Sequence, residues 1–391
     1  MSHSLSASGV VGLAGRFAVP DADAAHPRAL VLDGALLPMV GRLRVYTCGI
    51  TPYDVTHLGH AAVFVWTDLL RSLAGAVDVD TLMCRNVTDV DDVLTAAASG
   101  RGRPYDEFAL THEFRFDQDM ASLGVAAPDS SPRARAHVRQ TIQLAAALLE
   151  VGQAYERAGT VFFRGADLAG RSNLSLDDAV GLLHAFGDQA DDGRDHPLDV
   201  PVWRPSPAEH PAWPSPWGWG RPGWHAECAA MAATAFGSSV DILVGGADLA
   251  FPHHAYQAAM VEAASSVTPF ARRQMHIGTV HYRGEKMAKS TGNLVLVEDL
   301  LEHSTGPAVR LMLLNRRWAG AWEYDEPQLA AATVLLDSLH VAAGRPGSDA
   351  GAVAQVTTAL LDDLDVPRAV AIATETGGEA ARFLAGVLKL S

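Results

Sequence analysis

The feature that most constrains the fold is a short apolar run, a turn and an amphipathic helix in immediate succession. Leu43–Ile50 predicts a buried strand, and Gly49 and Pro52 mark the turn. A helix is predicted from His57 onward because apolar residues then repeat on one face, namely Leu58, Ala62, Val65, Leu69 and Leu73. The first N–H groups of a helix are unpaired and lie at the positive end of its dipole, so this junction predicts an anion site. The segment His57-Leu-Gly-His60 adds two imidazole donors and a glycine that leaves room for a phosphate chain.

The rest of the chain continues the alternation of strand and helix. Val77–Val87 predicts a second strand, and strand, helix and strand in succession are typical of a parallel sheet with helices on both faces. The following carboxylates, Asp89, Asp91 and Asp92, are interpreted as helix-capping residues without a catalytic role. Residues 1–42 carry little periodic signal, and residues 165–220 show mainly turns. Helices are predicted for Tyr105 to about Gly152, Glu227–Phe236, Tyr256–Ala264 and Pro327 to Leu388. The apolar stripe of the first of these is Val138, Ile142, Ala145, Ala146 and Leu149. Further strands are predicted for Tyr155–Arg164, Val240–Val244 and Met275–Val280.

Composition limits the kinds of partner. The chain has 391 residues, of which 48% are hydrophobic and 19% charged, so a large folded core of two or three domains is expected. Its formal net charge of −15 disfavours a nucleic-acid partner, because phosphate affinity comes from Lys and Arg. Three cysteines are too few for a disulfide framework and fit a reducing cytoplasm. The sequence shows neither a secretory signal pattern nor an apolar run near the roughly 20 residues of a membrane helix.

Two cysteines and a histidine are candidate metal ligands. Cys48, Cys228 and His253 all lie at predicted strand ends or helix starts, which meet at the carboxyl edge of a parallel sheet. Spacing alone leaves the question open, because the sequence contains no CxxC or HxxxH pair and a lone Cys or His is commonly a core or surface residue.

Two further segments could bind charged groups. Lys286-Met-Ala-Lys-Ser290 places two lysines on a glycine-flanked loop, which suits the charge that develops on a pyrophosphate leaving group, although such a loop is often only a solvated basic segment. Asp248 follows a predicted strand and is a candidate for holding or deprotonating an amine. A turn or cap role for Asp248 is equally consistent with its position.

Taken together, these segments resemble the class I aminoacyl-tRNA synthetases. His57-Leu-Gly-His60 and Lys286-Met-Ala-Lys-Ser290 resemble the two nucleotide-binding signatures, the second with Ala288 in place of the first Ser. Gly223-Trp-His-Ala-Glu-Cys228 and Phe251-Pro-His-His254 resemble motifs of the cysteine-activating branch. The resemblance implies that zinc is bound by Cys48, Cys228 and His253, with a fourth position left for the substrate thiolate. It also implies that ATP, with Mg2+, is a co-substrate, and that Gly49, Gly59 and Ser290 contribute to binding it. The implied pocket for cysteine and the adenylate contains Thr51, Thr88 and Trp224, although Trp224 could equally be a core residue. The residues with implied catalytic roles are His57, His60, Asp248, Lys286 and Lys289.

Within that family the chain is most similar to the mycothiol-pathway cysteine ligases. The resemblance rests on Gly49-Ile-Thr-Pro-Tyr-Asp, Trp213-Pro-Ser-Pro, Gly220-Arg-Pro-Gly-Trp-His and Asp362-Asp-Leu-Asp-Val-Pro367. Gln257 stands where cysteinyl-tRNA synthetases usually offer a Glu ligand, and no larger anticodon-reading region follows. The implied reaction joins L-cysteine to the amine of glucosaminyl-inositol through a cysteinyl-adenylate. Because Ala255, Ala288 and Tyr282-Arg283 depart from the family pattern, a paralogue that uses another amine stays open, as do a compact cysteinyl-tRNA synthetase and a non-catalytic nucleotide-binding homologue.

The expected fold is therefore a class I synthetase-like Rossmann (HUP-type) parallel sheet with an α/β insertion and a helical C-terminal domain. The predicted segments are an N-terminal segment 1–42, Rossmann halves 43–115 and 213–283 around an insertion 116–212, a lysine-loop and linking region 284–326, and a helical domain 327–391. The implied partners are small molecules, without nucleic acid or membrane, and a monomer in the cytoplasm is expected.

Overall fold

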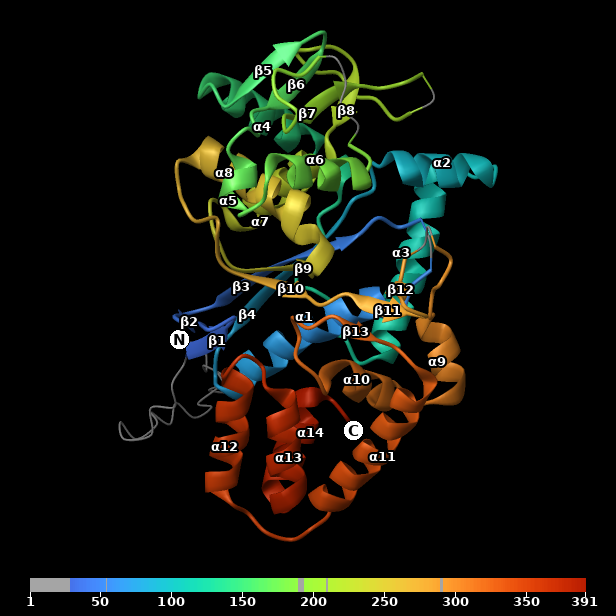
Figure 1. Cartoon of the computed structure of the whole chain (residues 1–391), viewed down its shortest axis with the longest axis vertical. Coiled ribbons are helices and arrows are strands. Elements are labelled where there is room, and N and C mark those ends of the chain that lie inside the picture. Colours follow the sequence, from blue (N-terminus) through green and yellow to red (C-terminus); the bar gives the residue numbers. More distant parts are fainter. Residues whose placement is uncertain (1–28, 54, 189–192, 209, 289–290) are drawn as a thin grey trace, which may run out of the picture.

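The computed structural model describes residues 29–53, 55–188, 193–208, 210–288 and 291–391. At its centre lies a parallel sheet of order β10-β9-β3-β4 (Figure 1). Its strands are β3 (Leu43–Ile50), β4 (Thr81–Val87), β9 (Val240–Gly246) and β10 (Ala271–Ile277), and α1 (Leu58–Ala76) connects β3 to β4. The predicted parallel sheet and the predicted strand Leu43–Ile50 are confirmed. β4 begins later than the predicted Val77, because Asp78 turns the chain with a φ of 57°.

Alternation along β3 divides the core between two faces of the sheet. Val45 packs into the apolar cluster that includes α1, whereas Tyr46 and Cys48 belong to the cluster on the other side. Successive strand residues point to opposite faces, so a strand covered on both faces must be apolar throughout. The side of the sheet that carries Cys48 is covered by α7 (Trp224–Phe236) and α8 (Ala255–Ser265).

The insertion forms a second sheet, which is antiparallel and has the order β5-β6-β7-β8 (Figure 1). Its strands are β5 (Ala154–Arg157), β6 (Thr160–Phe163), β7 (Val200–Pro205) and β8 (Gly220–Pro222), accompanied by α4 (Val138–Glu150), α5 (Leu168–Arg171) and α6 (Leu176–Ala185). The prediction that residues 165–220 are mainly turns was wrong, since α5, α6, β7 and β8 lie there. The predicted strand Tyr155–Arg164 is in fact a hairpin, because Ala158 and Gly159 reverse the chain with φ of 53° and 82°.

Three other predictions need correction. The helical stretch from Tyr105 is interrupted after α3 (Tyr105–Ser122), and a single 3-10 turn at Ala134–Ala136 precedes α4. The buried stripe of α4 is Val138, Thr141, Leu144, Ala145 and Leu148, while Ala146 is exposed. The weak signal over residues 1–42 hid a hairpin of β1 (Ala29–Leu32) and β2 (Ala35–Pro38), whose turn has positive φ at Asp33 and Gly34.

The C-terminal part is helical, as predicted, and ends its last helix at Leu388. It comprises α9 (Val297–His303), α10 (Gly306–Leu314), α11 (Glu326–Ala343), α12 (Ala350–Leu361), α13 (Val366–Thr376) and α14 (Gly378–Leu388). A small sheet of β11 (Val280–Tyr282), β12 (Glu285–Lys286) and β13 (Trp322–Glu323) precedes α11. Helix α2 (Asp92–Gly100) is capped by Asp91, whose carboxylate accepts from the N–H groups of Val93 and Leu94, which confirms the capping interpretation for Asp91. That interpretation was wrong for Asp89, which accepts from the N–H of Arg135, and for Asp92, which pairs with Arg204 and Arg221. The predicted segment boundaries stay predictions. In the part of the chain that the structure describes, no helix has the length and apolarity needed to cross a bilayer.

A buried ion pair fastens the C-terminal helices to the Rossmann core. Arg310 on α10 is 0% exposed, and its guanidinium donates to Asp68 of α1 at 2.6 Å. The same guanidinium donates to the backbone oxygens of Leu388 and Leu123, and Lys389 reaches Asp68 at 2.8 Å. Residues of α1, of the end of α3, of α10 and of the C-terminal end therefore meet at the ion pair of Arg310 and Asp68.

We expect Asp68→Asn to destabilise the protein by about 3–5 kcal/mol, because it leaves the buried guanidinium of Arg310 without its counter-ion. Urea unfolding measures the change. The control is Asp362→Asn, which breaks an exposed pair with Arg368 and should cost less than about 1 kcal/mol. Equal effects for the two variants would contradict the assigned role of the buried pair.

Candidate active site

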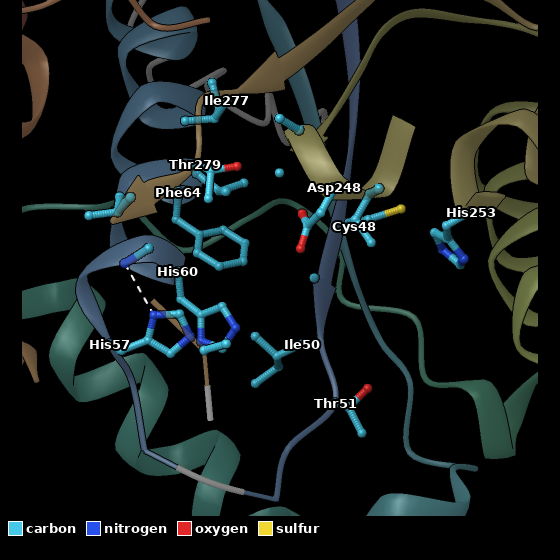
Figure 2. A pocket seen from close by; sticks show the side chains of 18 of the residues that line it. Cys48, Ile50, Thr51, His57, His60, Phe64, Asp248, His253, Ile277 and Thr279 are labelled. Atoms are coloured by element: carbon cyan, nitrogen blue, oxygen red, sulfur yellow. Dashed lines mark hydrogen bonds between the residues drawn. The ribbon is translucent and has the colours of Figure 1, made fainter. Parts of the chain in front are cut away.

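The start of α1 is organised by its two histidines. His57 is the N-cap, and its Nδ1 accepts from the N–H of Gly59 at 3.2 Å. The rings of His57 and His60 stack with their centres 3.9 Å apart (Figure 2). A Cβ on Gly59 would lie 3.0 Å from the His57 ring, so glycine allows this close packing. The predicted helix start at His57 is confirmed by the cap.

The same helix start is tethered to the segment that follows the lysine loop. The N–H of Leu58 donates to the carbonyl of Val295 at 2.8 Å, and the N–H of Val297 donates to the carbonyl of Thr56. The helix-start N–H groups of Leu58 and Gly59 thus have protein partners. The prediction of a helix start with unpaired N–H groups is therefore wrong for these two amides.

A cavity of about 450 Å³ lies between the helix start and the carboxyl ends of the sheet strands (Figure 2). It is lined by every predicted site residue that the structure describes: Cys48, Gly49, Thr51, His57, Gly59, His60, Thr88, Trp224, Cys228, Asp248, His253 and Lys286. Lys289 and Ser290 lie outside the described residues. Residues separated by more than two hundred positions in the sequence thus share one cavity.

The three candidate metal ligands meet at one end of this cavity. The sulfurs of Cys48 and Cys228 and a ring nitrogen of His253 all lie within 4.8 Å of one another, and all three residues are buried. Two thiols and an imidazole are a donor set that suits zinc. Burial lowers the pKa of His253 well below its usual value, which keeps the imidazole neutral and able to bind a metal. Burial, together with the neighbouring Cys48, raises the pKa of the Cys228 thiol. The residues present therefore fit a metal ion of this kind.

A stack of aromatic rings forms a wall beside the metal ligands. Trp224 stacks on His253 with ring centres 4.2 Å apart, and Phe186 stacks on Trp224 with ring centres 5.9 Å apart. Both Trp224 and Phe186 line the cavity, so Trp224 is a cavity residue. Phe186 follows α6, in the tract predicted to be mainly turns, and was missed.

Two further candidate residues form an exposed ion pair, in which Lys286 Nζ lies 2.7 Å from a carboxylate oxygen of Asp248. Lys286 lies on β12 instead of in the predicted glycine-flanked loop, and Asp248 follows β9. The side chain of Asn293 holds the turn around Lys286, since its Nδ2 donates to the carbonyls of Tyr282 and Lys286 and its Oδ1 accepts from the N–H of Ala288. Thr51 and Thr88 hydrogen-bond each other at 2.7 Å.

Comparison with known proteins agrees with this geometry. A family model described as the tRNA synthetases class I (C) catalytic domain matches residues 38–334. The chain belongs to this family. Among solved structures, methionyl-tRNA synthetase of Mycobacterium tuberculosis in complex with methionyl-adenylate resembles this class I fold with a TM-score of 0.60. That likeness covers 90% of this chain and 82% of the other at 18% identity, and it concerns the fold alone.

Two kinds of curated relative within the family are similar to the chain. The L-cysteine:1D-myo-inositol 2-amino-2-deoxy-alpha-D-glucopyranoside ligase of Acidothermus cellulolyticus is 40% identical over 380 residues, which are 95% of this chain and 93% of that protein. The cysteine–tRNA ligase of Rhodospirillum rubrum is 40% identical over 338 residues, which are 85% of this chain and 73% of that protein.

Some residues of this class I site were not found from the sequence. Asn86 donates to the sulfur of Cys228 at 3.1 Å, and His225 Nδ1 lies 3.0 Å from His253 Nδ1. Asn86 could have been found from the sequence, because it is a polar residue near the end of an otherwise mostly apolar strand. His225 lies within the Gly223–Cys228 motif, although nothing in the spacing shows which way its ring points.

We expect Cys228→Ala to abolish tight zinc binding, because it removes one of three ligands. Zinc content after dialysis, measured by mass spectrometry, tests this. Cys84→Ala is the matched control, since Cys84 is also buried but stands outside the ligand group. If Cys228→Ala keeps as much zinc as Cys84→Ala, the assigned ligand set is wrong.

Proposed function

We propose that the chain catalyses the ATP-dependent joining of L-cysteine to the amine of a 2-amino-2-deoxyglucosyl inositol (glucosaminyl-inositol), with release of AMP and pyrophosphate. The observation that carries the proposal is the placement of Cys48, Cys228 and His253 in one cavity with His57 and His60. A cavity that would bind sulfur at one end and phosphate at the other suits the activation of a thiol amino acid by a nucleotide.

The thiol end would select cysteine. A zinc ion held by Cys48, Cys228 and His253 would offer its remaining coordination position to the substrate sulfur. The hydroxyl of serine is a harder and much weaker ligand, so it would be discriminated against at binding. The wall of Trp224 and Phe186 would exclude water from this end and leave space for a small side chain.

The nucleotide end would stabilise charge on the phosphates. His57, His60, Lys286 and Lys289 are proposed to contact the triphosphate, with Mg2+ as counter-ion, and Gly49, Gly59 and Ser290 are proposed to lie against the nucleotide. Attack of the cysteine carboxylate on the α-phosphorus forms the acyl phosphate bond and releases pyrophosphate. Cationic groups placed where this leaving charge develops lower the barrier.

The second step transfers the cysteinyl group. The acceptor amine attacks the activated carbonyl, the carbon–oxygen bond to AMP breaks, and the amine loses a proton as the amide forms. Asp248 is proposed to hold an amine, and Thr51 and Thr88, which line the same cavity, are proposed to contact the substrate. Displacing the Lys286 ammonium from Asp248 would make its carboxylate available.

Charge and coverage support the sugar amine over tRNA as acceptor. The formal charge of −15 is unfavourable for gripping a polyanion. The A. cellulolyticus ligase is matched over 93% of its length, compared with 73% for the R. rubrum cysteine–tRNA ligase. The identity of 40% to each keeps cysteinyl-tRNA synthesis as the second candidate. We further propose that the chain works as a monomer on small molecules in the cytoplasm, where its three free cysteines would stay reduced.

The deciding experiment measures cysteine-dependent ATP–pyrophosphate exchange and then adds a single acceptor. We expect exchange with L-cysteine and almost none with L-serine, followed by AMP release and amide formation on addition of glucosaminyl-inositol. Consumption of the adenylate by tRNA instead would establish the second candidate. Exchange without transfer to either acceptor would favour a paralogue that uses another amine, and a lack of exchange would contradict catalysis altogether.

We expect Lys286→Ala to lower the exchange rate by about 10²–10³-fold, the range seen when one transition-state charge donor is removed. Pyrophosphate exchange at saturating ATP and cysteine measures the loss. The control is Arg283→Gln, which removes an exposed cation from the same turn without touching the cavity lining. A similar loss for both variants would point to general loop electrostatics and against a specific role for Lys286.

A further inference from the structure

Each of the three candidate metal ligands contacts an uncharged polar side chain through its ligand atom or ring. Asn86 contacts Cys228 at 3.1 Å, Gln257 contacts Cys48 at 3.4 Å, and His225 contacts His253 at 3.0 Å. These neighbours are themselves buried. Hydrogen bonds from such outer groups commonly fix the orientation of metal ligands and tune their electron donation.

The orientation of the Asn86 amide is fixed by the backbone. Its Oδ1 accepts from the N–H of Gly49 at 2.8 Å, and this bond leaves Nδ2 facing the sulfur of Cys228. Asn86 is 1% exposed, so both of its polar groups are shielded from bulk water. An N–H donor therefore points at one of the two sulfurs in the folded chain.

Gln257 can supply the matching donor to the other sulfur. It is 0% exposed, its Oε1 accepts from the Cys48 thiol, and its Nε2 has no hydrogen-bond partner in the part of the chain that the structure describes. A cysteine must lose its proton to bind a metal, and a deprotonated sulfur only accepts hydrogen bonds. A half-turn of the amide then places Nε2 on the sulfur and gives this buried N–H group a partner.

We propose that Asn86 and Gln257 are positioning residues that donate one N–H each to the two metal-binding sulfurs and thereby enable a third sulfur to join them. Two thiolates neutralise a divalent ion, so a substrate thiolate would leave a net negative charge in a buried site. Two N–H donors offset part of that charge, whereas a carboxylate at position 257 would add to it. The identity of the third sulfur as that of L-cysteine rests on the proposed function, while the two hydrogen bonds do not.

The test follows the metal without ATP or acceptor. The purified full-length chain and its variants Gln257→Met and Asn86→Asp are loaded with Co2+, whose sulfur-to-metal charge-transfer band reports electron donation by the thiolates. Gln257→Met keeps the side-chain length and removes the donor. Asn86→Asp keeps an oxygen for the N–H of Gly49 and removes the N–H that faces Cys228. The matched control is Gln274→Met, because Gln274 is exposed on β10 and outside the cavity lining.

Both site variants should show the charge-transfer band at lower energy, a metal dissociation constant raised by about 10–100-fold, and weaker binding of L-cysteine in a spectral titration. Gln274→Met should behave like the unaltered chain. Circular dichroism checks folding. If Asn86→Asp does not fold, the result for Gln257→Met alone decides whether the proposal holds. If a site variant folds but binds no cobalt at all, that result also supports the proposal.

Band energies and dissociation constants equal to those of the unaltered chain in Gln257→Met would overturn the inference, as would failure of the unaltered chain to bind cobalt. The proposed function fails separately. A chain that behaves as expected with cobalt and L-cysteine but forms no cysteinyl amide would contradict the function and leave the two hydrogen bonds standing.

Discussion

The close approach of β3 and β4 at Gly49 is the contact on which the site depends. A Cβ at that position would lie 1.8 Å from the carbonyl oxygen of Asn86, so any other residue would force the two strand ends apart. With glycine present, the Gly49 N–H reaches the Asn86 side chain, and that side chain reaches Cys228. The neighbouring Cys48 then faces the same point from β3. Backbone packing at one glycine thus sets the spacing of both thiols.

The central sheet carries the candidate metal ligands on one face and packs against α1 and the C-terminal helices on the other. Val45 faces the cluster that contains α1 and the C-terminal helices, while Cys48 faces the cluster with α7 and α8. The ion pair of Arg310 and Asp68 ties α10 to α1, and His57 caps the first turn of α1. The helical C-terminal part therefore holds the helix whose first turn lines the cavity.

Much of the Rossmann half was predictable because its signals are local. β3, the start of α1 and α7 follow from apolar runs, a cap and a helical period within single segments. The insertion was not predictable in the same way. β7 gains its strand identity by pairing with β6, about forty residues earlier, and strands of four residues such as β1 and β5 are too short to show a period. The three candidate metal ligands come together through the topology of the sheet, so the sequence spacing of Cys48, Cys228 and His253 could not show that they share a site. Only the resemblance to the family implied it. Gln257 was noticed as a departure, whereas its contact with Cys48 required the folded chain.

The exposed pair of Lys286 and Asp248 has a consequence for how a nucleotide enters. Both side chains are partly exposed, and pairs of this kind contribute at most about 1 kcal/mol. An equilibrium of at most that size leaves at least roughly one molecule in six with the two groups apart at any moment. Under the proposed function, Lys286 would therefore be available to a triphosphate without a costly rearrangement, and its ammonium would exchange one carboxylate partner for several phosphate oxygens. Entry of ATP beside Lys286 would then be an ion exchange.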